Sequence, residues 1–184
     1  KLERQYKKEG SEAIVEHTNK NGSTNMEQNP GYGMDPHCMH AAELIREAFD
    51  CPDSAVHFLV GGTQTNTTVI AATLKPYEGV LSADTGHINV HETGAIESTG
   101  HKVIHCPSPD GKVTVAMIES VLAGHSSEHM VTPKLVYISN PSEYGTLYSK
   151  AELEALSETC RELGLYLFLD GARLGYGLMA EGYD

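Results

Sequence analysis

From residue 35 onward, short apolar runs alternate with segments in which apolar residues recur at helical spacing. The runs that predict β-strands are Val56–Val60, Gly79–Ala83, Lys102–Cys106, Leu135–Ser139 and Tyr166–Asp170. The segments that predict helices are 35–49, 63–75, 113–124 and 149–164. This alternation predicts an α/β fold, a three-layer sandwich in which helices cover both faces of a mostly parallel sheet.

The ends of the helices and of the domain are also marked in the sequence. Asp35-Pro36 is a helix start signal, and Ser149 with Glu152 forms a capping box for a helix that closes at Gly164. Residues 1–30 are polar, and no linker divides residues 31–184, so we expect a polar N-terminal segment followed by one domain. The sequence begins at Lys1 and stops shortly after the last strand, so we interpret it as part of a longer domain.

The composition of the chain argues against several classes of binding partner. The 184 residues carry a formal net charge of −12 without a basic stripe, which argues against nucleic acid and anionic membrane surfaces as partners. No apolar stretch approaches the roughly 20 residues of a membrane span. The four cysteines have no zinc-ligand spacing and no signal sequence is evident, so we expect free thiols and a cytoplasmic location.

The apolar strand that ends at Asp170 carries the most informative candidate residue. A carboxylate at the carboxyl end of a buried strand lies where ligands bind in open α/β sheets. Such a charge can hold the protonated ring nitrogen of pyridoxal phosphate, although it could also bind a metal or cap a helix.

A second candidate site lies at the start of the helix predicted from residue 63. Gly61 and Gly62 allow close approach of a ligand to the backbone, and the helix start with Thr63 offers N–H and hydroxyl donors that suit a phosphate. The alternative is a plain strand–helix turn capped by a threonine.

His87 follows the strand that ends near Asp84. His87 and His91 are four residues apart, as two metal ligands on a helix would be, but the sequence supplies no HExxH motif and no third ligand. We therefore expect no metal and interpret His87 as stacking on a planar cofactor or acting as an acid or base. A histidine held by local hydrogen bonds is the alternative.

Together these positions match the three contacts that pyridoxal phosphate needs, namely a phosphate anchor, a ring clamp and a counter-ion for the ring nitrogen. Arg173 follows Asp170 by three residues and could hold a substrate carboxylate, or it could only brace the turn or pair with Asp170. The segment 139–145 is expected to border the same crevice, as a ligand contact or a plain turn.

The chain resembles the threonine aldolase and β-eliminating lyase family, which depends on pyridoxal phosphate and has the aspartate-aminotransferase fold. The stretches that carry this resemblance are Pro30–Gly33, Gly61–Asn66, Ala83–Ile88 and Phe168–Leu174. It implies that Gly62 and Thr63 contact the phosphate, that His87 stacks on the ring, that Asp170 pairs with the ring nitrogen, and that Arg173 lies near the substrate carboxylate or a cofactor oxygen.

The resemblance also implies an activity and an assembly. The expected reaction is retro-aldol cleavage of a β-hydroxy amino acid, or loss of a β-substituent, by a homodimer or homotetramer. The family's reactive lysine and its smaller domain would fall beyond Asp184, and the segment 140–144 lacks the aldolase histidine. The alternatives are an aminotransferase or cysteine desulfurase, a non-catalytic domain of the same fold, and a metal-dependent hydrolase.

Overall fold

The computed structural model describes residues 28–180, and the chain separates into two compact units that divide between Phe58 and Leu59. Most of the polar segment predicted for residues 1–30 lies outside the described residues. In the first unit, helix α2 (Pro36–Ala48) begins at the predicted signal. The carboxylate of Asp35 caps the helix by accepting a hydrogen bond from the backbone N–H of Cys38 at 2.9 Å.

The second unit holds the remaining elements in alternating order. They are α3 (Gly62–Thr73), β1 (Glu78–Ala83), α4 (His87–Val90), the 3₁₀ turn η1 (Glu97–Thr99), β2 (Val103–Cys106), α5 (Val115–Gly124), β3 (Thr132–Ser139), α6 (Lys150–Glu162), β4 (Tyr166–Asp170) and α7 (Leu174–Gly177). None of the helices within residues 28–180 is long and apolar enough to span a bilayer.

The four strands form one sheet in the order β2-β1-β3-β4, and every neighbouring pair is parallel. The register places Ala83 beside Cys106 and Ser139 beside Asp170, so the carboxyl ends of the strands reach the same edge of the sheet. The predicted parallel α/β sheet is confirmed.

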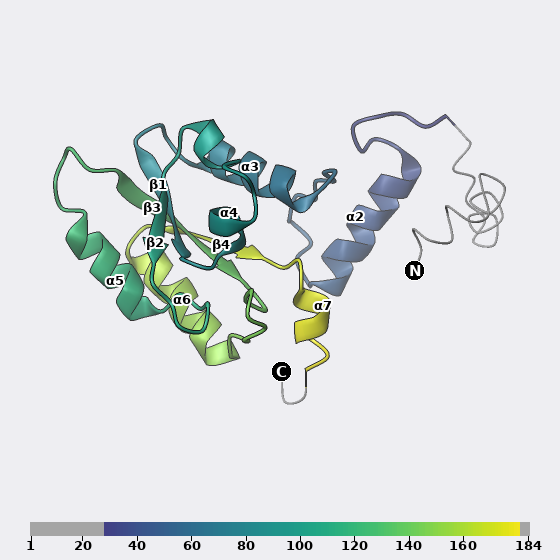
Figure 1. Ribbon diagram of the computed structural model, residues 1–184. Helices are drawn as coiled ribbons and strands as arrows, with labels where there is room; N and C mark the ends of the chain where they lie inside the picture. The colour runs from purple at the N-terminus through teal and green to yellow at the C-terminus, as the bar shows by residue number, and fades with distance from the viewer. Residues whose placement is uncertain (1–27, 181–184) are drawn as a thin grey trace, which may run out of the picture. The chain divides into compact units, whose positions relative to one another are not determined.

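Two apolar clusters hold helices on opposite faces of this sheet, as Figure 1 shows. On one face, Leu81 and Ile138 pack with residues of α5 and α6 such as Ile118 and Leu156. On the other face, Val80 and Tyr137 pack with α3 and α4. Successive strand residues point to opposite faces, which is why neighbours such as Val80 and Leu81 belong to different clusters. This arrangement is the predicted three-layer sandwich.

The strand predicted at Val56–Val60 is wrong, because these residues adopt no regular structure. Phe58 is 48% exposed and Val60 is 94% exposed. The backbone N–H of Val60 donates to the side-chain oxygen of Gln64 rather than to a neighbouring strand. An apolar run alone does not define a strand, since it also needs a partner that pairs with its backbone.

The capping box predicted for α6 is confirmed. The hydroxyl of Ser149 accepts a hydrogen bond from the backbone N–H of Glu152, and the Glu152 carboxylate accepts one from the backbone N–H of Ser149 at 2.8 Å. Gly164 follows the helix with a φ of 64°, a left-handed conformation that glycine adopts without strain.

Substituting Tyr148→Phe should destabilise the fold measurably. The hydroxyl oxygen of Tyr148, a residue only 1% exposed, accepts a hydrogen bond from the backbone N–H of Val113 at 2.6 Å. Its loss leaves a buried donor unpaired, at a cost of about 1–3 kcal/mol in the free energy of unfolding. Urea denaturation measures this loss. Tyr166→Phe is the matched control at a 51% exposed position, and an equal effect there would contradict the assignment.

Candidate functional site

Asp170 lies at the carboxyl end of β4, where three donors surround its carboxylate. Oδ2 accepts hydrogen bonds from the hydroxyl of Tyr137 at 2.6 Å and from the amide Nδ2 of Asn66 at 3.4 Å. Oδ1 accepts from the backbone N–H of Ala172 at 2.9 Å. The residue is partly buried, so a fixed acceptor stands at this strand end, as the sequence predicts.

Tyr137 supplies the shortest of these hydrogen bonds. It lies on β3, is 1% exposed, and packs edge-on against Phe168 of β4. Burial raises the pKa of the Tyr137 hydroxyl, and the hydrogen bond to Asp170 raises it further. The Tyr137 hydroxyl therefore stays protonated across the usual pH range and donates a hydrogen bond to Asp170.

The start of α3 carries the predicted phosphate residues. Gly61 is the extended residue before the helix, and Gly62 and Thr63 form its first turn. No side chain of residues 28–180 caps this turn, so its backbone N–H groups are left for a ligand or solvent. Asn66 is four residues beyond Gly62, a rise of about 6 Å along the helix. Its contact with Asp170 therefore brings the helix start and the carboxylate to one place.

His87 opens the short helix α4, directly after a tightly packed turn. A Cβ on Gly86 would overlap the hydroxyl of Ser82 and lie 3.0 Å from the carbonyl oxygen of Ala83, so a side chain here would force Ser82 to move. Nδ1 of His87 lies 2.8 Å from Oε1 of Glu92, and the ring is tilted against that of His91 with centroids 5.5 Å apart. The imidazole is 33% exposed, whereas the Glu92 side chain is fully buried.

Arg173 does not pair with Asp170, the alternative that the sequence leaves open. Its Nη2 lies 2.7 Å from Oε1 of Glu143, and its Nε donates to the carbonyl oxygen of Pro141 at 3.2 Å. The Glu143 side chain is 9% exposed and also accepts from the hydroxyl of Ser139 at 2.8 Å. Arg173 thus braces the segment after β3, while its own side chain stays 34% exposed.

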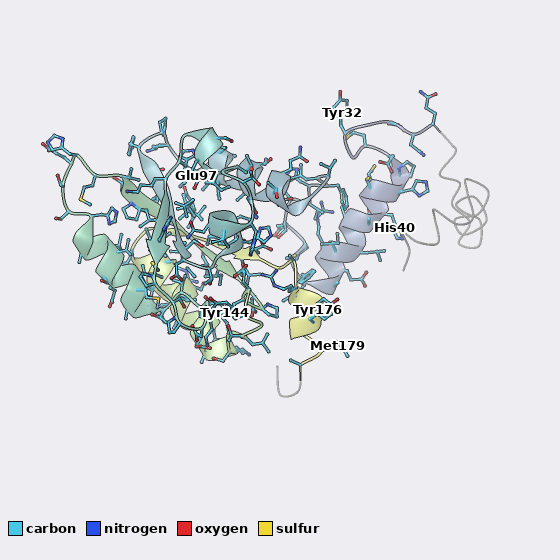
Figure 2. The ribbon with its side chains drawn as sticks, viewed as in Figure 1. Tyr32, His40, Glu97, Tyr144, Tyr176 and Met179 are labelled. Carbon is cyan, nitrogen blue, oxygen red and sulfur yellow. The ribbon has the colours of Figure 1, made fainter. Side chains whose placement is uncertain are left out.

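A shallow pocket beside Arg173 leads to the surface. Its walls include Pro141, Leu147 and Gly177, and Arg173 lines it as well. Tyr176, which also lines the pocket, is 82% exposed and projects from α7 (Figure 2). The guanidinium of Arg173 thus lies at the edge of an open, mostly apolar pocket.

One chain of hydrogen bonds and ion pairs joins the predicted residues His87, Asp170 and Arg173. Its members, in order, are His87, Glu92, Asn66, Asp170, Tyr137, Ser139, Glu143 and Arg173. The sequence predicts no role for Asn66, Glu92 or Tyr137, and it leaves Glu143 open between a ligand contact and a turn residue. Asn66 is the last residue of the stretch Gly61–Asn66, and Glu92 directly follows His91, whereas Tyr137 stands in an apolar run as an ordinary core residue would.

Within residues 28–180, no three His, Cys, Asp or Glu side chains gather closely enough to hold a metal ion. The four cysteines, all in this range, are free. The functional groups at the site are instead a helix start without a side-chain cap among the described residues, a partly exposed imidazole, a carboxylate that accepts three hydrogen bonds, and a guanidinium. This set suits an anionic, planar ligand with a cationic ring atom.

Known proteins share this chain's sequence and fold. A low specificity L-threonine aldolase from Pseudomonas aeruginosa is 36% identical over 144 residues, which cover 77% of this chain and 41% of the relative. A threonine aldolase structure from Leishmania major is 54% identical with a TM-score of 0.87, covering 94% of this chain and 50% of that one. The chain therefore spans about half or less of the length of these relatives.

More distant structures share the fold alone. A methionine aminotransferase from Escherichia coli is 18% identical with a TM-score of 0.63, covering 87% of this chain and 41% of that one. This similarity shows that the three-layer domain shares the fold of an aminotransferase. The sequence profile of the β-eliminating lyase family matches residues 12–176. The chain belongs to the β-eliminating lyase family, as its motifs predict.

Proposed function

We propose that the protein carrying this chain is a pyridoxal-phosphate-dependent lyase that cleaves β-hydroxy or β-substituted amino acids in the manner of a threonine aldolase. The contact between Asn66 and Asp170 is the observation that carries this proposal. This contact brings together a helix start that suits a phosphate and a carboxylate that suits a protonated ring nitrogen. Pyridoxal phosphate carries both of these groups within one small molecule. Family membership and the two threonine aldolase relatives support the same activity.

The residues present fit this cofactor. The backbone of Gly61, Gly62 and Thr63 would bind its phosphate, because no side chain in the described part of the chain caps the first turn of α3. Asp170 would hold the proton on the ring nitrogen, and its three donors keep the carboxylate in place. His87 would stack on the ring. When bound, pyridoxal phosphate supplies an electron sink for a bond that breaks at the α-carbon of the amino acid.

His87 and Arg173 would act on the substrate. His87 would accept the β-hydroxyl proton at a ring nitrogen, because its imidazole is the partly exposed base of the network. Arg173 would bind the substrate carboxylate through its exposed part, while Glu143 and the carbonyl oxygen of Pro141 hold the guanidinium in orientation.

We also propose a cytoplasmic homodimer or homotetramer. The four free cysteines fit a reducing compartment. Helix α2 leaves Leu44 and Ile45 exposed by 51% and 37%, and Phe49, directly after the helix, by 63%, which are apolar side chains that association would cover. Light scattering should give at least twice the monomer mass, and a monomer at micromolar concentration would contradict this.

Cofactor and product assays test the activity. The full-length protein should retain visible pyridoxal-phosphate absorbance through gel filtration and convert L-threonine to glycine and acetaldehyde. Formation of a keto acid without glycine would indicate an aminotransferase instead. Absence of cofactor absorbance would indicate a non-catalytic domain, and activity lost on chelation would indicate a metal-dependent hydrolase.

Substituting Asp170→Asn should reduce turnover roughly 10²–10³-fold, the range for removing one electrostatic stabiliser from an active site. The amide keeps the shape of the side chain but cannot neutralise a protonated ring nitrogen. Steady-state kinetics measure the loss. Asp53→Asn, the same change at an exposed position in the first unit, should leave turnover unchanged. Full activity of Asp170→Asn would overturn the counter-ion role.

A further inference from the structure

Glu92 carries a buried carboxylate that has no role in the function proposed above. Its side chain is fully buried, and its Oε1 lies 2.8 Å from Nδ1 of His87 and 2.6 Å from Nδ2 of Asn66. Its Oε2 is buried without a hydrogen-bond partner among the described residues. His87 is the one basic side chain that residues 28–180 place within ion-pair distance of it. A buried charge with so few partners is costly to keep, which points to a role beyond packing.

Asn66 fixes the position of this carboxylate. It is 2% exposed, and its Nδ2 donates to Glu92 at 2.6 Å and to Asp170 at 3.4 Å. An amide nitrogen carries two hydrogens, so a single Asn66 can serve both acceptors. Asn66 thereby separates two carboxylates that would otherwise repel each other, and it ties Glu92 to the strand end that carries Asp170.

The partner of Nδ1 decides which nitrogen of His87 carries the proton. An ionised carboxylate only accepts hydrogen bonds, so Nδ1 must be the donor in the contact with Glu92. In the neutral imidazole this leaves the lone pair on Nε2. Without an acceptor at Nδ1, a neutral histidine side chain favours the opposite tautomer, with the proton on Nε2. A base that accepts a proton at Nε2 therefore depends on the carboxylate behind it.

We propose that Glu92 is a positioning residue that holds His87 in the Nδ1–H tautomer, with Asn66 anchoring Glu92 to Asp170. The tautomer assignment stands on the geometry alone. Its catalytic consequence, a free lone pair on Nε2 of His87, rests on the proposed function. Glu92 itself touches neither substrate nor cofactor in this assignment.

The first test reads the tautomer directly. Long-range ¹H–¹⁵N spectra of the full-length protein, at a pH where the imidazole is neutral, should show His87 protonated at Nδ1. His87→Gln identifies the signal by its disappearance. Glu92→Gln keeps an acceptor oxygen and should keep the tautomer, whereas Glu92→Met should shift His87 to a majority of Nε2–H. Glu97→Gln is the matched control, because Glu97 lies exposed at the surface (Figure 2).

The second test separates positioning from structural support. Glu92→Met should lower kcat roughly 10–100-fold, the range for losing a residue that orients a functional histidine. KM and the Kd for pyridoxal phosphate should stay within about threefold, and Glu92→Gln should recover most of kcat. A purely structural role would instead lower the thermal midpoint and cofactor retention without moving the tautomer.

Two outcomes would overturn the proposal. One is an Nε2–H tautomer in the unsubstituted protein, a result that does not depend on whether any variant folds. The other is an unchanged tautomer in a folded Glu92→Met protein. If the Nδ1–H tautomer is present but the protein neither retains pyridoxal phosphate nor cleaves threonine, the proposed function fails and the role of Glu92 in holding the tautomer stands.

Discussion

The contact between Asn66 and Asp170 is the interaction on which the rest of the site depends. It joins residues 104 positions apart, one on α3 and the other at the end of β4. Helix α3 is held in place by Ile70 and Leu74, which pack on the same face of the sheet as Tyr137. Apolar packing of the helix thus brings the amide to the carboxylate, and a helix start and a strand end become one site.

The parallel sheet explains why polar groups accumulate at this edge. Every strand runs in the same direction, so the segments after β1, β3 and β4 all begin at the same edge. Those segments supply His87, Glu143 and Arg173. Glu92 and Glu143 each keep one buried carboxylate oxygen without a hydrogen-bond partner among residues 28–180, at a cost of about 1–3 kcal/mol that functional sites commonly carry.

The sequence predicted the fold well because its signals are local. Alternating apolar runs defined all four strands of the sheet, and caps such as Asp35 and the Ser149–Glu152 pair marked helix starts. The error at Val56–Val60 has the opposite origin, since whether an apolar run finds a neighbouring strand depends on distant residues.

The candidate site was only partly predictable. Asp170, His87 and the glycines of α3 stand out beside their own strand and helix ends. Their partners do not, because a hydrogen bond such as that between Tyr137 and Asp170 has no local signature in the sequence. Tyr137 was indistinguishable from a core residue, and Glu143 from a residue in a turn. Hydrogen bonds between side chains from distant elements form only in the folded chain, so the sequence does not reveal them.

The ion pair between Arg173 and Glu143 limits how an anion can approach the guanidinium. Nη2 already faces Glu143 and Nε already donates to the carbonyl oxygen of Pro141, so two of the donors are engaged. An anion that displaced Glu143 would leave this nearly buried carboxylate without its positive neighbour, which is costly for a charge with little access to water. We therefore expect an anion to join the pair from the exposed side of Arg173 rather than to take the place of Glu143.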